Sequence, residues 1–141
     1  MLRLVYDSLT GNVRHFAETL AAELHVSPMR VQDPAPTDAY LLLTYTFGSG
    51  EVPASTRRLL TTHGHLLRGV VASGSYHWGH NFARAADVIA AEYRVPVVAK
   101  LNKGGTAADR AAVRRWLLHY AESAPPFPTS CTGEPTPWNA G

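Results

Sequence analysis

Hydroxyl and amide side chains gather between the first apolar run of the chain and the segment that follows it. The residues there read Asp7-Ser8-Leu9-Thr10-Gly11-Asn12-Val13. Ser8, Thr10 and Asn12 can donate hydrogen bonds, and Gly11 lets the backbone turn sharply beside a ligand. If a helix starts at Asn12, its first backbone N–H groups have no acceptor within the helix and lie at the positive end of its dipole. The loop is therefore predicted to cradle a phosphate group.

The composition of this loop narrows the kind of phosphate ligand. The loop contains no Lys, whereas the nucleoside-triphosphate loop uses a Lys to reach the outer phosphates. It contains one Gly, whereas the dinucleotide-binding fingerprint has three. What remains is a loop suited to one terminal phosphomonoester. An ordinary capped helix after a strand would show the same residues, so this loop alone leaves both interpretations open.

Two further loops combine glycine with aromatic residues. One reads Thr44-Tyr45-Thr46-Phe47-Gly48-Ser49-Gly50-Glu51, and the other reads Ser73-Gly74-Ser75-Tyr76-His77-Trp78-Gly79-His80. Offset stacking on aromatic rings contributes about 0.5–1.5 kcal/mol beyond area burial. Taken alone, the first loop could be a surface turn, and Trp78 could pack beneath the next helix. The three loops together predict a pocket for a phosphorylated planar ring, and flavin mononucleotide (FMN) is the evident candidate.

The elements that would position these loops alternate along the chain. Hydrophobic patterns predict strands over residues 2–6, 25–31, 39–45, 68–73 and 96–101, and helices over 12–24, 53–60, 81–93 and 106–119. This alternation predicts an α/β fold with a doubly wound five-stranded parallel sheet, order 2-1-3-4-5, and helices on both faces. Ligands of such sheets bind beyond the carboxyl ends of the strands, where the strand order reverses. All three loops leave the sheet at that edge.

The composition favours one globular domain and excludes several partners. The chain has 141 residues, of which 45% are hydrophobic, and a net charge of +2 that is too small to indicate a nucleic-acid partner. No apolar run or signal peptide suggests a membrane, and the lone Cys131 forms no internal disulfide, so a cytoplasmic location is expected. Residues 1–122 are expected to form the domain, and the Pro-rich residues 123–141 a largely disordered tail.

Other functions of this fold class lack the residues that they require. A phosphoacceptor domain would need an Asp at the end of the third strand, where the chain has Thr44-Tyr45. Esterase chemistry would need a Gly-x-Ser-x-Gly spacing that Ser49 does not have. The histidine pairs at positions 63 and 65 and at positions 77 and 80 have no nearby carboxylate or Cys to complete a metal site. Neither a catalytic side chain nor a metal site is expected.

Several segments together resemble one family. They are Ser8-Leu9-Thr10-Gly11-Asn12-Val13, Thr44-Tyr45-Thr46 with Gly50-Glu51-Val52-Pro53, and Ala72-Ser73-Gly74 with Trp78-Gly79-His80-Asn81-Phe82-Ala83. The later residues Glu92-Tyr93, Val95-Pro96 and Leu101-Asn102-Lys103-Gly104-Gly105-Thr106 also fit. On these residues the chain resembles the NrdI family, the flavodoxin-like activators of class Ib ribonucleotide reductase, from Leu2 to about His119.

The resemblance implies a flavodoxin-like protein that binds FMN and passes electrons singly. A reductase or another reduced donor would supply the electrons, and the reduced flavin would convert O2 into superoxide. The superoxide would reach the dimanganese site of the reductase small subunit (NrdF-type) and help to generate its tyrosyl radical. The flavin carries this chemistry, so no side chain need act as an acid or base. FMN contacts are expected from Ser8, Leu9, Thr10, Gly11, Asn12, Val13, Thr44, Tyr45, Thr46, Phe47, Gly48, Ser49, Gly50, Ser73, Gly74, Tyr76, His77, Trp78 and Gly79.

The alternative is a conventional flavodoxin that carries electrons to another redox enzyme. Carriers of that type are usually acidic, whereas this chain has a sequence pI of about 8.9. Arg57, Arg58, His77 and His80 are close in sequence to the predicted ring site. Positive charge there would stabilise a flavin that becomes anionic on reduction and would attract small anions. The charge therefore favours the superoxide-producing function.

Overall fold

The strands of the chain form one parallel sheet with helices on both faces. The structure is a computed structural model that describes residues 2–34, 36–48, 50–75, 79 and 81–123. Its strands are β1 (Arg3–Tyr6), β2 (Met29–Arg30), β3 (Tyr40–Tyr45), β4 (Leu67–Gly74) and β5 (Val97–Asn102). Its helices are α1 (Asn12–Leu24), α2 (Ala54–His63), the 3-10 helix η1 (Gly64–Leu66), α3 (Arg84–Tyr93) and α4 (Ala107–Ser123). The sheet order β2-β1-β3-β4-β5, with parallel pairing, confirms the predicted fold class.

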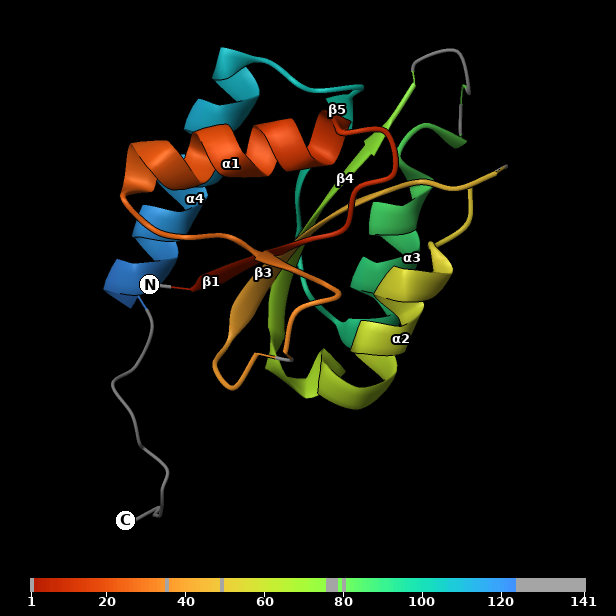
Figure 1. Cartoon of the computed structure of the whole chain (residues 1–141), viewed down its shortest axis with the longest axis horizontal. Coiled ribbons are helices and arrows are strands. Elements are labelled where there is room, and N and C mark those ends of the chain that lie inside the picture. Colours follow the sequence, from red (N-terminus) through yellow and green to blue (C-terminus); the bar gives the residue numbers. More distant parts are fainter. Residues whose placement is uncertain (1, 35, 49, 76–78, 80, 124–141) are drawn as a thin grey trace.

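Two apolar clusters hold the layers together. Figure 1 shows α1 and α4 on one side of the sheet and α2 and α3 on the other. Alternate residues of β1 point to opposite faces: Leu4 belongs to the cluster under α1 and α4, and Val5 to the cluster under α2 and α3. β3 lies at the centre of the sheet and is buried along almost its whole length, as its continuous apolar sequence predicts.

The start of the second strand differs from the prediction. A strand was expected over residues 25–31, but β2 contains only Met29–Arg30. His25 takes a left-handed conformation (φ 59°) and ends α1, and the N–H of Val26 donates to the carbonyl oxygen of Ala21 at 3.0 Å. These residues complete the helix end, so the chain cannot extend into the sheet until it has left that turn.

The starts of the last two helices show what the local sequence can predict. The expected cap of α4 is confirmed, because the N–H of Asp109 donates to Thr106 Oγ1 at 3.1 Å and the N–H of Thr106 donates to Asp109 Oδ2 at 2.9 Å. α3 was expected from residue 81, but it begins at Arg84. Its preceding residue, Ala83, is left-handed (φ 50°) and packs directly on Gly74, where any Cβ would lie 2.5 Å from the Ala83 nitrogen. That start depends on a tertiary contact.

Candidate flavin site

A cavity of about 390 Å³ lies at the carboxyl edge of the sheet, beyond β1, β3 and β4. Its volume lies within the range of small-molecule sites, about 300–1,000 Å³. All three predicted loops contribute to it. The lining residues are Ser8, Leu9, Thr10, Asn12, Val13, Tyr45, Thr46, Phe47, Gly48, Ser73, Gly74, Ser75 and Lys103. The structure therefore brings together residues that are up to 95 positions apart, from Ser8 to Lys103.

The loop after β1 leaves the start of α1 open toward this cavity. Gly11 has φ 95°, a conformation that L side chains rarely adopt, and no side chain caps the helix. Ser8 Oγ accepts a hydrogen bond from the Gly11 N–H at 3.1 Å, which closes the turn one residue before the helix. The backbone N–H groups of the first turn of α1 are thus left for another acceptor, as a phosphate cradle requires.

At the starts of α3 and α4, side chains accept hydrogen bonds from backbone N–H groups. Thr46 Oγ1 accepts a hydrogen bond from the Ala85 N–H at the start of α3 at 3.3 Å, and Thr106 with Asp109 caps α4. The carboxylate of Asp7 lies at the start of α2. The first turn of α1, in contrast to those of α3 and α4, has no side-chain cap and faces the cavity.

Asp7 is a buried carboxylate that connects the phosphate loop to α2. Its side chain is held by the hydroxyl groups of Ser55 and Thr56, the latter donating at 2.7 Å. Thr56 is also within 2.7 Å of the hydroxyl of Thr44 on β3. Asp7 is only 2% exposed, and charge at a helix N-terminus is favoured by the helix dipole. This network fixes the residue directly before the phosphate loop.

Tyr45 joins the same network from the cavity side. Burial raises the pKa of the Tyr45 hydroxyl, the negative charge of Asp7 raises it further, and a hydrogen bond with Ser55 acts in the opposite direction. Tyr45 also lines the cavity. Tyr45 therefore presents a phenol that interacts with Ser55 at the wall of the cavity.

The second loop folds as a tight turn that leaves one aromatic side chain available. The N–H of Phe47 donates to the carbonyl oxygen of Glu51, and the N–H of Glu51 donates to that of Phe47, both at 2.8 Å. Phe47 is 52% exposed and Leu9, from the phosphate loop, is 66% exposed. Both line the cavity, so a planar apolar ligand would find hydrophobic surface at its rim.

The predicted site residues do not all line the cavity. Thr44 is buried in the sheet, Gly11 borders a neighbouring cavity, and Gly50 packs against Arg84, where a Cβ would lie 2.7 Å from the Arg84 side chain. Gly79 stands in open space and does not line it. Ser49, Tyr76, His77 and Trp78 lie outside the described residues.

Arg57 and Arg58, which are close in sequence to the predicted ring site, do not line the cavity described above. Arg57 donates to Glu92 of α3 at 2.5 Å, and this hydrogen bond raises the pKa of its guanidinium. Arg58 lies beside a different, smaller cavity between α2 and residues 31–33. Both side chains lie on other sides of α2, because the apolar side of this helix packs on the sheet. The two histidines named with them, His77 and His80, lie outside the described residues.

Sequence reasoning missed Lys103 as a site residue. It comes from the turn after β5, which the strand order places beyond β4, and this turn reaches the cavity beside the phosphate loop. The sequence contains one signal for this turn: Lys103 is followed by Gly104-Gly105, a pair that marks a sharp change of direction.

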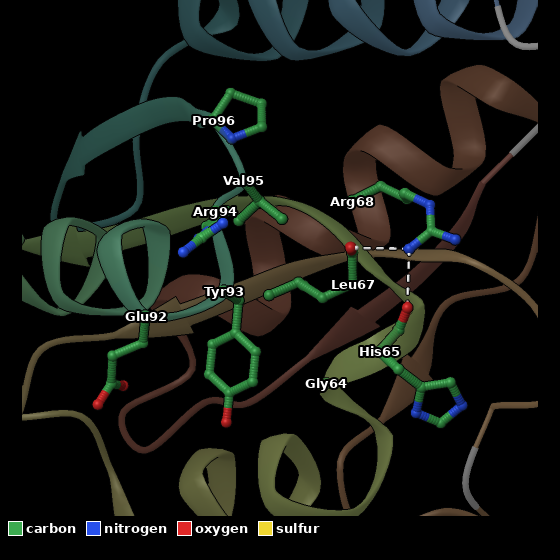
Figure 2. A pocket seen from close by; sticks show the side chains of 9 residues that line it. All are labelled: Gly64, His65, Leu67, Arg68, Glu92, Tyr93, Arg94, Val95 and Pro96. Atoms are coloured by element: carbon green, nitrogen blue, oxygen red, sulfur yellow. Dashed lines mark hydrogen bonds between the residues drawn. The ribbon is translucent and has the colours of Figure 1, made fainter.

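A second cavity, of about 460 Å³, lies at the opposite edge of the sheet between η1, β4 and the end of α3. Figure 2 shows the charged ends of Arg68 and Arg94 pointing in opposite directions. Arg68 donates to the carbonyl oxygens of His65 and Leu67, at 3.0 Å each. The polar groups do not converge there, so this cavity lacks the arrangement of a ligand site.

The described residues contain no group of three or more His, Cys, Asp or Glu side chains that could hold a metal ion. None of the helices in the described part of the chain has the length and apolar content needed to span a membrane.

The fold and the position of the cavity define a flavodoxin-like protein. A solved structure, "Structure of a Short-Chain Flavodoxin Associated with a Non-Canonical PDU Bacterial Microcompartment", superimposes with a TM-score of 0.68 at 17% identity, covering 89% of this chain and 100% of that one. The sequence assigns the chain to one family within this fold. The family model "NrdI Flavodoxin like" matches residues 4–115, and the chain belongs to this family.

Two relatives support this assignment. "Protein NrdI" of Bacillus licheniformis is 42% identical over an alignment of 114 residues, and the match covers 77% of this chain and 82% of that protein. "SPbeta prophage-derived protein NrdI" of Bacillus subtilis is 34% identical over 107 residues, 75% of this chain and 83% of that protein. Membership in the family confirms the resemblance and is consistent with a flavoprotein tied to ribonucleotide reductase.

Proposed function

We propose that the chain is a cytoplasmic FMN protein that activates a class Ib ribonucleotide reductase. The observation that carries the proposal is the open N-terminus of α1 at one end of a cavity whose rim is aromatic and apolar. That arrangement suits a phosphomonoester joined to a planar ring. Family membership supplies the link to ribonucleotide reductase. The domain responsible would comprise residues 1–122, with residues 123–141 as a tail.

The fit of FMN to the residues present supports this choice of flavin. The first-turn N–H groups of α1 and the side chains of Thr10 and Asn12 would hold the phosphate, with Ser8 closing the turn. One glycine turn suffices for one phosphate, whereas a second phosphate and an adenosine would need a longer glycine-rich turn. Tyr45 and Phe47 would contact the ring, together with Tyr76 and Trp78 of the third loop.

The chain's own residues bind, orient and shield the cofactor. When bound, FMN would supply one-electron chemistry toward O2, giving superoxide as the oxidant for the dimanganese small subunit (NrdF-type). Thr46 is buried and anchors its loop to α3 through the Ala85 N–H, so the loop is held against the cavity. Phe47 to Glu51 would form part of the docking rim for the small subunit, because the half-exposed Phe47 leaves an apolar surface beside the cavity.

The test mixes reduced, FMN-loaded protein with O2 and a manganese-loaded class Ib small subunit, and measures the tyrosyl radical. Radical above the protein-free control is expected. Purified or reconstituted protein should also show a flavin absorption spectrum, with FMN as the cofactor released on denaturation. Failure to bind FMN at micromolar concentration would contradict the cofactor assignment. A protein that binds reducible FMN but yields no radical would instead be a conventional electron carrier.

A further inference from the structure

Lys103 occupies a backbone conformation that disfavours a lysine. Its φ is 58°, in the left-handed region, where glycine is the residue of lowest cost. Both of its backbone groups are held: its N–H donates to the Gly74 carbonyl oxygen at 2.7 Å, and its own carbonyl accepts from Ser73 Oγ at 2.5 Å. The end of β4 therefore fixes this residue at the cavity despite the cost.

The turn that carries Lys103 lies against the start of α1. A Cβ on Gly104 would stand 3.6 Å from Asn12 Oδ1, and one on Gly105 would stand 3.0 Å from the Phe16 ring. Gly104 follows Lys103 directly and Asn12 is the first residue of α1. The long, flexible side chain of Lys103 therefore starts close to the open N–H groups of that helix.

The charge of Lys103 is not used elsewhere in the described structure. Arg14, on the first turns of α1, pairs with Glu18 at 3.1 Å, and Arg30 pairs with Asp33 at 3.3 Å. No ion pair or hydrogen bond joins the ammonium of Lys103 to a described residue. Among the described residues that line this cavity it is the only cation, and none of them is acidic.

We propose that the ammonium of Lys103 is the charge partner of the flavin phosphate, and this inference rests on the proposed function. A phosphomonoester carries about −1.5 to −2 charge at pH 7, and the N–H groups of a helix start offset only part of it. A charge-assisted hydrogen bond from Lys103 offsets the rest. Lys103 is thus a determinant of specificity for the phosphorylated cofactor over the unphosphorylated one.

The experiment measures the dissociation constants of FMN and of riboflavin by fluorescence quenching. Lys103→Met should weaken FMN binding roughly tenfold or more, while riboflavin binding stays within about twofold of wild type. Lys103→Arg should retain most of the FMN affinity. Raising the salt concentration should weaken FMN binding to wild type more than to Lys103→Met, because the ammonium–phosphate attraction is screened.

Two further variants separate charge from structure. Lys100→Met removes the same charge three positions earlier, where Lys100 pairs with Asp87 at 2.7 Å outside the cavity, and it should leave FMN affinity unchanged. Lys103→Gly suits the left-handed backbone, so its urea midpoint should equal or exceed that of wild type while its FMN affinity falls as in Lys103→Met.

The outcomes are distinct. Equal loss of FMN and riboflavin affinity in Lys103→Met would overturn the inference, because Lys103 would then act on the turn or the ring. Wild-type affinity for FMN in Lys103→Met and Lys103→Gly would overturn it as well, and would leave the proposed function standing. Absence of FMN binding by the wild-type protein would overturn both.

Discussion

The two tyrosines of β3 lie at opposite ends of one strand and in opposite environments. Tyr40, at the amino edge of the sheet, is fully buried, and its hydroxyl donates to the carbonyl oxygen of His63 at 3.0 Å. Tyr45, at the carboxyl edge, is partly exposed and lines the candidate flavin cavity. Burial raises the pKa of both hydroxyl groups, but only Tyr45 has a buried carboxylate as a contributing neighbour.

The difference teaches how one sheet separates stability from binding. At the amino edge, polar atoms bond to one another: Tyr40 to the end of α2, and Arg68 to two carbonyl groups. The carboxyl edge differs among the described residues. The start of α1 has no side-chain cap, the Phe47 ring is half-exposed, and the Lys103 ammonium has no ion-pair partner. Substitutions at the two edges should therefore affect different measurements.

The largest effect is expected from Asp7→Asn, because Asp7 lies at the carboxyl edge but is part of a buried hydrogen-bond network. The amide oxygen accepts the hydrogen bonds of Ser55 and Thr56 more weakly than the carboxylate does, and the substitution removes negative charge from the start of α2. The free energy of unfolding should fall by about 2–3 kcal/mol in urea titrations. Asp38→Asn is the matched control, because Asp38 is an exposed partner of Arg3 and should cost less than about 1 kcal/mol. Equal losses in the two variants would contradict the role of the network.

Thr10→Ala tests the carboxyl edge alone. Loss of one hydrogen bond to a charged acceptor costs about 1.5–3 kcal/mol, so FMN should bind roughly tenfold or more weakly. Riboflavin, which lacks the phosphate, should bind nearly as before, and the urea midpoint should not change. The two dissociation constants, measured side by side, provide the check. A parallel loss for both ligands would mean that Thr10 supports the loop and does not contact the phosphate.

Tyr40→Phe tests the amino edge alone. It removes the hydrogen bond to His63 and should cost about 1 kcal/mol of stability at pH 7, with FMN affinity unchanged. Since the folded-state pKa of Tyr40 is raised above its ordinary value of about 10, its contribution is complete below that pH and is lost as the pH rises further. Urea titrations between pH 7 and 11 should therefore show a shallower alkaline loss of stability in Tyr40→Phe than in wild type.

The smallest effect is expected from Arg57→Met. The side chains of Arg57 and Glu92 are 38% and 49% exposed, so solvent screens their ion pair. Stability should fall by less than about 1 kcal/mol, and FMN affinity should not change. Glu92→Gln is the matched control, and the double variant should cost no more than either single one. A marked loss of FMN affinity in Arg57→Met would show that this residue reaches the cofactor after all.

Much of the fold could be predicted because it depends on local patterns. The apolar face of α1 predicted a helix from Asn12 to Leu24, as observed. The Thr106–Asp109 pair predicted the start of α4. The strand order followed from the alternation of strands and helices. Local patterns failed where the chain's course is set by contacts between distant segments, as at Ala83 against Gly74.

Local patterns also predicted which loops would meet at one cavity, whereas the contacts of individual residues with FMN stay a prediction. The loops after β1, β3 and β4 carried recognisable residue types, and many of their members line one cavity. Lys103 was not recognised, because its role depends on how the turn after β5 packs against Asn12. Arg57 and Arg58 are close in sequence to the predicted ring site but do not line the cavity, because proximity in sequence does not specify which side of α2 they occupy. Side-chain direction on a helix is set by the packing of its apolar face.

The Asp7 network also has a consequence for the order in which the chain folds. Its hydrogen bonds join Asp7 to residues 48 and 49 positions further along, so the segment before the phosphate loop lacks its partners until α2 has docked on the sheet. Contacts of this sequence separation form late, because a long loop must close first. A nascent chain that ends before Ser55 therefore carries every residue of the phosphate loop but lacks both hydroxyl partners that hold Asp7 in place.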